Sequence, residues 1–422
     1  TSEGVMPQPS GPVRSFGTQG DRSKTCTFFT IAAAVAALQP TASTPLRMAP
    51  LGVFCGGVSG GPATACDETT PILWPPGPAA TLAVVEHHSG FRVRFQGHDG
   101  VAGAPNNSVL CPLVPGSQGV AFASALVVND TLWVFGTNDV AMDGGKPRTQ
   151  VRVFWSSDRE LAATSWKNSA VLQLPQNGSA NPHNPPYIVP WWTAFNTSPT
   201  KGTINGRPAY VLAIELGSPS ALIGVRFTSV FAVCFSCADS DDLSNGWEVL
   251  DPTDHIYIRS RYSACPTLRY FGSYFYLVTL FEDVPNAAGP HCNSSSTVWG
   301  ACLAEHVVRS KDLAEWEESK YNGGLIMGLP DGNNVMGPDH TIISNSLLDQ
   351  AGGAADKAFA RNQTDDINRS DMDMVDLPDG STYVVWLTGN QGAATPPNPP
   401  LGFSGAGIVH ATQQEWLESF FP

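Results

Sequence analysis

The sequence carries little charge, and its balance is of the wrong sign for binding nucleic acid. Only 14% of its 422 residues are charged, and 37 acidic against 23 basic side chains give a net charge of −14. Nucleic-acid binding requires a basic surface, so this balance argues against it. Long apolar runs are also scarce. The apolar run Thr25–Leu38 is too short to span a bilayer.

Several common site motifs are missing. No phosphate-binding loop of the form G-x-x-x-x-G-K-[ST] occurs. The histidines at 183, 255, 291 and 340 lack the spacing of metal ligands. We therefore expect no cofactor and no catalytic metal. A structural calcium ion at Asp371, Asp373 and Asp376 stays open as an alternative, although the full spacing of an EF-hand loop is absent.

The first residues resemble a secretory leader. Arg22 and Lys24 precede the apolar run, and the small-residue stretch QPTASTP follows it. This pattern predicts a signal peptide over residues 1–43 and a mature chain over residues 44–422. A buried helix or a disordered leader is the alternative.

The cysteine count agrees with secretion. Of nine cysteines, Cys26 lies in the predicted leader, which leaves an even number for disulfides. Cys234 and Cys237 form a lone C-x-x-C for which a disulfide is favoured over zinc, because no second pair has zinc-ribbon spacing. N-x-S/T triplets add to the picture of a secreted glycoprotein, and they begin at Asn106, Asn129, Asn177, Asn196, Asn293, Asn362 and Asn368.

Internal repeats indicate the fold. The 41 glycines and 35 prolines are typical of many short strands joined by tight turns. Hairpin-like segments, each with a turn before an apolar strand, occur at 125–139, 203–215, 268–282 and 375–391, with a weaker copy at 85–99.

A second pattern follows these hairpins. Ser, an acid and Leu precede a tryptophan that opens another strand at Trp166, Trp247 and Trp316, and more loosely at Trp416. Hairpin, strand, turn and tryptophan strand make a four-stranded unit of roughly 70 residues. We therefore predict an all-β fold, a five-bladed β-propeller of four-stranded antiparallel blades. It forms one domain closed by its terminal strands, with the tryptophans packed between blades.

Acidic residues mark a candidate site on this fold. Asp371 and Asp373 are two residues apart in a strand-like segment, which places them on one face. The segment is the first strand of its blade, so both acids are expected to face the central channel. Two neighbouring carboxylates repel each other, so the arrangement needs a functional or structural reason.

Several segments carry a family resemblance. FNTS…YVLAIELG…GVRFTSVFA…SDDL…W (195–247), RYSACPTLRYFGSYFYLVTL, VVRSKDLAEWEES, NRSDMDMVDLPDGSTYVVWLTGNQ and EWLESFFP resemble five-bladed propeller proteins related to arabinanases, invertases and β-mannoside phosphorylases. The resemblance covers residues 120–422 and is specific for the superfamily, not for a substrate. It implies a glycoside hydrolase-like domain with carboxylates on different blades around a funnel.

The resemblance also implies roles for residues. Glu215 is the candidate acid, because the apolar strand before it favours a raised pKa. Asp373 is the candidate base and Asp371 its positioning partner. Candidate sugar ligands are Asp139, Asn196, Arg261, Glu282, Asn390 and Trp192. The chain departs from the family in its first blade, where only Asp67 and Asp99 could stand for the usual aspartate.

These observations predict a secreted glycoside hydrolase that acts on a poly- or oligosaccharide by carboxylate acid–base catalysis. The alternative is a non-catalytic carbohydrate-binding or structural extracellular glycoprotein on the same fold. Both interpretations expect a carbohydrate partner, no nucleic acid and no membrane span.

Overall fold

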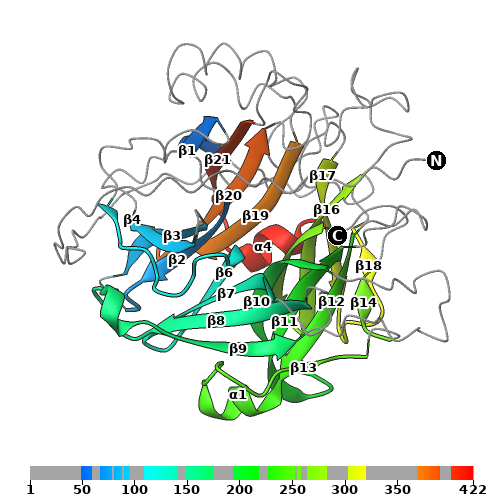
Figure 1. The fold of residues 1–422 in the computed structure, drawn as a ribbon. Helices are drawn as coiled ribbons and strands as arrows, with labels where there is room; N and C mark the ends of the chain where they lie inside the picture. Colours follow the sequence, from blue (N-terminus) through cyan, green and yellow to red (C-terminus); the bar gives the residue numbers. More distant parts are fainter. Residues whose placement is uncertain are drawn as a thin grey trace, which may run out of the picture.

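The computed structural model describes residues 49–58, 67–77, 80–87, 90–95, 109–140, 148–173, 193–217, 227–251, 254–257, 264–282, 303–319, 368–389 and 401–421. Their strands form five small antiparallel sheets arranged around a common axis (Figure 1). This is the predicted five-bladed β-propeller. The predicted leader lies outside the described residues.

Blades 1 to 3 follow in chain order. Blade 1 consists of β2 (Asp67–Trp74), β3 (Thr81–His87), β4 (Phe91–Phe95) and β5 (Val109–Leu110). Blade 2 consists of β6 (Ala121–Val128), β7 (Thr131–Val140), β8 (Arg148–Ser156) and β9 (Lys167–Gln173), with the short helix η1 (Ala163–Ser165) before β9. Blade 3 consists of β10 (Thr193–Ile204), β11 (Arg207–Gly217), β12 (Phe227–Cys234), β13 (Glu248–Val249) and the extra strand β14 (Ile256–Tyr257), with helix α1 (Phe235–Ser240) after β12.

Blades 4 and 5 complete the ring. Blade 4 consists of β15 (Ala264–Phe271), β16 (Tyr274–Glu282), β17 (Leu303–Ser310) and β18 (Glu317–Glu318). Blade 5 consists of β19 (Asn368–Asp376), β20 (Thr382–Gly389), β21 (Leu401–Val409) and, as its outer strand, β1 (Ala49–Val58). Helix α4 (Gln413–Glu418) follows β21.

The ring closes as predicted, because the first strand of the chain completes the last blade. β1 pairs antiparallel with β21 from Ala49–Ile408 to Val58–Leu401. The first strand of every blade lies innermost, and each contacts the next around the axis, including β19 with β2. A pairing between residues so far apart in sequence ties both ends of the chain into one ring.

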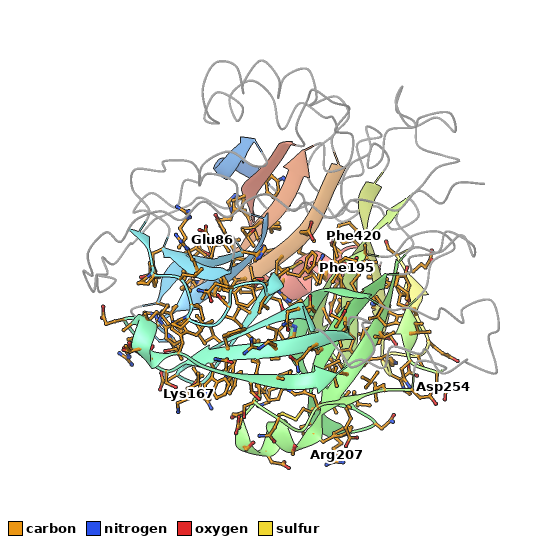
Figure 2. All side chains as sticks on the ribbon, viewed as in Figure 1. Glu86, Lys167, Phe195, Arg207, Asp254 and Phe420 are labelled. Atoms are coloured by element: carbon orange, nitrogen blue, oxygen red, sulfur yellow. A yellow bond between two sulfur atoms is a disulfide. The ribbon has the colours of Figure 1, made fainter. Side chains whose placement is uncertain are left out.

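Apolar side chains fill the space between neighbouring blades (Figure 2). The repeat tryptophans belong to this packing, which confirms their structural interpretation. Trp247 packs edge-on against Phe135 of blade 2, and Trp316 stacks on Phe231 of blade 3. Among the described residues, no helix is long and apolar enough to cross a membrane.

Two repeat assignments from the sequence are wrong in detail. The segment around Trp416 was expected to open a strand, but it forms α4. Thr412 and Glu415 make a reciprocal capping box that starts this helix, and the outer strand of blade 5 comes from β1 instead. The hairpin copy at 85–99 corresponds to β3 and β4, the second and third strands of blade 1, so the blade begins earlier, at Asp67.

Candidate active site

Each inner strand carries a β-bulge in its pairing with the second strand of its blade. The register shifts lie between Asp67 and Thr69, Ala121 and Ser124, Ala194 and Thr197, Ala264 and Thr267, and Ser370 and Asp373. Phe122, Cys265 and Asp371 begin three of these bulges with positive φ values of 61°, 51° and 54°. A bulge re-aims side chains locally. The five bulges together bring an irregular stretch of every inner strand to the same level of the axis.

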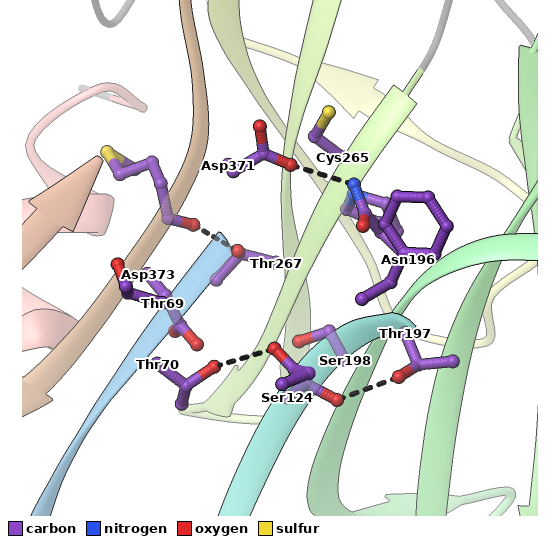
Figure 3. Close-up of a pocket in the computed structure, with 14 residues that line it drawn as sticks. Thr69, Thr70, Ser124, Asn196, Thr197, Ser198, Cys265, Thr267, Asp371 and Asp373 are labelled. Atoms are coloured by element: carbon purple, nitrogen blue, oxygen red, sulfur yellow. Dashed lines mark hydrogen bonds between the residues drawn. The ribbon is translucent and has the colours of Figure 1, made fainter. Parts of the chain in front are cut away.

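A pocket lies on the axis at this level (Figure 3). All five inner strands contribute to its lining, which comprises Thr69, Thr70, Phe122, Ala123, Ser124, Asn196, Thr197, Ser198, Cys265, Pro266, Thr267, Asp371, Met372 and Asp373. The cavity holds about 30 Å³. That volume is sufficient for water.

Hydroxyl side chains join the inner strands around the pocket. Ser124 Oγ and Thr197 Oγ1 lie 2.8 Å apart between blades 2 and 3, and Leu268 N–H of blade 4 donates to Ser198 Oγ of blade 3 at 2.9 Å. Thr267 Oγ1 donates to the carbonyl of Met372 in blade 5. These bonds hold the lining strands at fixed positions, because buried hydroxyl groups are costly to leave unpaired.

Glu215 lies beside this pocket on the second strand of blade 3. The pairs Ala194–Leu216 and Thr197–Ile214 place Phe195 and Asn196 of the bulge opposite Glu215. The carboxyl is 3% exposed, and its Oε2 accepts the Cys265 N–H at 2.8 Å. Burial raises the pKa of Glu215 to about 8; the Cys265 N–H opposes this rise and the charge of Asp371 adds to it. Glu215 is therefore protonated at neutral pH.

Asp371 lines the pocket next to Asn196. Its Oδ1 accepts a hydrogen bond from Asn196 Nδ2 at 2.8 Å, which links blade 5 to blade 3 (Figure 3). Asn196 also hydrogen-bonds to the Glu215 carboxyl through its main chain and its side chain. One residue therefore contacts two acids from different blades.

Asp373 also lines the pocket, so the expectation that both acids face the axis is confirmed. The bulge separates their surroundings, however. Asp373 is 7% exposed and forms an ion pair with Arg269. Its Oδ1 also accepts the N–H of the next residue, Met374, at 2.7 Å. Arg269 is itself fixed through Gln413 Oε1 at 2.9 Å. The base role predicted for Asp373 stays a prediction.

For the other ligands predicted from the sequence, the structure gives a position in the strand register or describes nothing. Asp139 and Glu282 occupy register positions paired with Thr149 and Leu303. Both lie three positions beyond the residue of their strand that faces the bulge, so neither is equivalent to Glu215. Arg261, Asn390 and Trp192 lie outside the described residues, as does Asp99. The catalytic and ligand roles of all these residues stay predictions.

Sequence reasoning missed Glu86, which lies beside the bulge of blade 1 and is paired with Thr69. It is 3% exposed and binds Arg94 through both oxygens, at 2.7 and 3.0 Å. The signal was present, because Glu86 and Arg94 flank a turn in VEHHSGFRVRF. The assignment of 85–99 as a first-and-second-strand hairpin hid the place of Glu86 on the second strand, beside the inner-strand bulge.

The predicted cysteine and metal chemistry is partly resolved. Cys234 and Cys237 form the predicted disulfide, and Cys111 is disulfide-bonded. Cys265 is not in a disulfide, so the prediction that all eight cysteines of the mature chain form disulfides is wrong for this residue. The pairing of the remaining cysteines stays a prediction. Within the part of the chain that the structure describes, no three His, Cys, Asp or Glu side chains are grouped to hold a metal ion. A structural calcium ion thus stays a prediction without support from these residues.

Comparisons with known proteins bear on the fold. The chain matches no protein-family model and no curated protein sequence. Among solved structures, it is similar to a variant of the GH43 protein BlXynB from Bacillus licheniformis, at 12% identity and a TM-score of 0.43, over 88% of this chain and 54% of that one. The chain thus spans about half the length of BlXynB.

Two further solved structures are similar over most of both chains. An α-L-arabinofuranosidase from Lactobacillus brevis is 10% identical, with a TM-score of 0.43, over 81% of this chain and 90% of that one. An α-L-arabinanase from Cellvibrio cellulosa, complexed with arabinohexaose, is 10% identical, with a TM-score of 0.43, over 84% and 98%. The five blades establish the propeller fold independently of these similarities.

Proposed function

We propose that the protein is a glycoside hydrolase in which Glu215 is the general acid. The observation that carries this proposal is a buried carboxyl beside an axial pocket, whose pKa burial raises to about 8. A general acid needs a pKa near the working pH so that it holds a proton and can release it. No Lys or Arg among the described residues forms an ion pair with Glu215, so none of them stabilises its ionised form.

The second carboxylate in this proposal is Asp371 rather than Asp373. Asp371 lines the pocket and is joined to the acid through Asn196, whereas Asp373 is held by Arg269. Glu215 protonates the glycosidic oxygen, and Asp371 accepts a proton from the water that attacks the anomeric carbon. Two carboxyls on different elements flanking the scissile bond are the usual requirement of glycoside hydrolysis. The cavity beside Asp371 is large enough for that water.

Wild-type protein and a set of variants test this assignment against a panel of aryl glycosides and polysaccharides. Glu215→Gln and Asp371→Asn should each lower kcat about 10²–10⁴-fold, the usual contribution of one acid or base. The double variant Glu86→Gln with Arg94→Met is the matched control, since it neutralises a glutamate of equal burial beside another bulge without leaving Arg94 uncompensated. Unchanged activity in Glu215→Gln, on a substrate that the wild type hydrolyses, would remove Glu215 from the mechanism.

A non-catalytic carbohydrate-binding protein is the second candidate. The ion pair between Asp373 and Arg269 favours it, because that pair engages one of the pocket carboxylates that catalysis could use. Glycan binding by wild-type protein that hydrolyses nothing in the panel would support this candidate.

Secretion and N-glycosylation are part of the proposal. Asn129 is exposed on the turn between β6 and β7 and is open to a glycan. Asn196 begins another triplet, but it lines the axial pocket between blades 3 and 5, so a glycan there is incompatible with this site. Mass spectrometry of peptides from the secreted protein should find a glycan on Asn129 and none on Asn196.

A further inference from the structure

Asn196 is the residue through which the two pocket acids meet. It lies in the bulge of β10 directly opposite Glu215, so its main chain and side chain both reach that carboxyl. Its Nδ2 also donates to Asp371 Oδ1 at 2.8 Å (Figure 3). A side-chain amide offers two N–H donors on one nitrogen, which allows a single residue to serve two acceptors. The bulge thus places a neutral donor between two acids.

A neutral donor has a different effect from a cation at this position. Two nearby carboxyls repel each other when both are ionised, so one of them retains its proton more strongly. A guanidinium would favour ionisation of both, as a cation does beside any carboxylate. An amide satisfies the oxygens without supplying charge. The amide therefore keeps the two acids in place and does not abolish the difference in how readily each carboxyl ionises.

We propose that Asn196 is a positioning residue that holds the carboxyls of Glu215 and Asp371 in place relative to each other with neutral amide donors, rather than a ligand of the sugar. The catalytic meaning of this inference rests on the proposed function. The contacts themselves, and the titration of Glu215, do not depend on any activity.

Other groups around Glu215 do not replace Asn196. The Cys265 N–H of β15 donates to Oε2, and Ser229 of β12 is the cross-strand neighbour of Glu215. The nearest charge that acts on Glu215 is Asp371, and Asp373 farther along β19 is paired with Arg269. The Asn196 bonds lower the pKa of Glu215 and the Asp371 charge raises it, so loss of the two residues must shift the titration in opposite directions.

The test is a titration of the full chain, labelled with ¹³C at the glutamate carboxyl carbons and followed by NMR. Glu215→Gln identifies the Glu215 signal, whose midpoint in the wild type is expected near pH 8. Asn196→Ala should move the midpoint upward by roughly one unit, the effect of one lost hydrogen bond to the charged form. Asp371→Asn should move it downward.

Two further variants keep the test decisive. Asn129→Ala is the matched control, because it removes an asparagine amide that donates to another aspartate, Asp241, at 3.0 Å on an exposed turn. It should leave the midpoint unchanged. If Asn196→Ala does not fold, Asn196→Asp preserves the shape, replaces the donor with an acceptor and should also raise the midpoint. A Glu215 midpoint that stays at the wild-type value in a folded Asn196 variant overturns the proposal.

Kinetics separate positioning from sugar binding. A positioning role predicts that Asn196→Ala shifts the pH profile of kcat and leaves KM little changed. A sugar ligand would instead raise KM with the Glu215 midpoint unmoved, and that result also overturns the proposal. Wild-type protein that hydrolyses no glycoside would reject the proposed function, while the titration still decides the role of Asn196.

Discussion

Blade 1 and blade 3 each bury a glutamate beside the bulge of the inner strand, and they hold its carboxyl in different ways. Glu86 and Glu215 are both 3% exposed. Glu86 binds the Arg94 guanidinium through both oxygens, whereas Glu215 receives only amide donors and faces another acid, Asp371. A bidentate guanidinium stabilises a carboxylate, and amides beside a like charge leave the proton in place. A buried glutamate beside an inner-strand bulge thus supports a structural ion pair in one blade and a candidate proton donor in the other.

The largest expected effect comes from breaking the blade 1 pair. Arg94→Met leaves Glu86 buried without its cation, which should lower the free energy of unfolding by about 3–5 kcal/mol. The double variant Glu86→Gln with Arg94→Met should recover most of this loss, because it removes the uncompensated charge. Urea unfolding at pH 7 measures both. A loss below about 1 kcal/mol in Arg94→Met would mean that Glu86 is not held as a buried charge.

The second effect concerns blade 3 and depends on pH. The unfolded pKa of Glu215 is 4.5 and the folded pKa is about 8. Between these values the folded state keeps a proton that the unfolded state has lost, so Glu215 makes the free energy of unfolding fall by about 1.4 kcal/mol per pH unit as pH rises. Its stabilising contribution is complete below pH 4.5 and is lost as pH rises through about 8.

Urea unfolding of wild type and Glu215→Gln from pH 4 to pH 9 isolates this contribution. The difference between the two curves should decline across the window and level off above it. The same comparison with Asp373→Asn serves as a control, since Asp373 is a buried carboxylate that is paired with a cation, Arg269. A difference curve for Glu215→Gln that is flat or rises with pH would show that Glu215 is ionised in the folded state.

The blade architecture was predictable because it depends on local patterns. Turn residues and apolar strands recur with each blade, and the tryptophans that follow the Ser–acid–Leu turns fill the gaps between blades. The ring closure by β1 and β21 was also expected from the repeat count. These features follow from periodicity and turn chemistry, which a sequence shows directly.

The arrangement of the site was not predictable to the same extent, because it depends on the bulges. Strand alternation places Asp371 and Asp373 on one face, but it does not reveal that a residue with φ of 54° begins an irregular stretch at Asp371. Because of that irregularity, Asp371 accepts a hydrogen bond from Asn196, whereas Asp373 forms an ion pair with Arg269. The partners come from β10 and β15, distant strands whose relative register no local pattern specifies.

The smallest expected effect concerns the residue behind Glu215. Ser229 is its cross-strand neighbour, and within the described chain its buried Oγ has no hydrogen-bond partner. The corresponding neighbour of Glu86 in blade 1 is Arg92. A buried hydroxyl without a partner contributes nothing that offsets its desolvation, so Ser229→Ala should change the free energy of unfolding by less than about 1 kcal/mol, in either direction.

Ser198→Ala is the control for this prediction. The Ser198 hydroxyl accepts the Leu268 N–H at 2.9 Å between blades, so its loss leaves a buried donor unpaired and should cost about 1–3 kcal/mol. A Ser229→Ala variant that loses as much would mean that the hydroxyl accepts the proton of Glu215. In that case the pH window of stability would also move to lower pH, because a bond to the neutral carboxyl raises its pKa. In blade 3, Glu215 would then be held by Ser229 of β12 as well as by the bulge residues of β10, and the contrast with Glu86, which is paired with a cation, would be sharper.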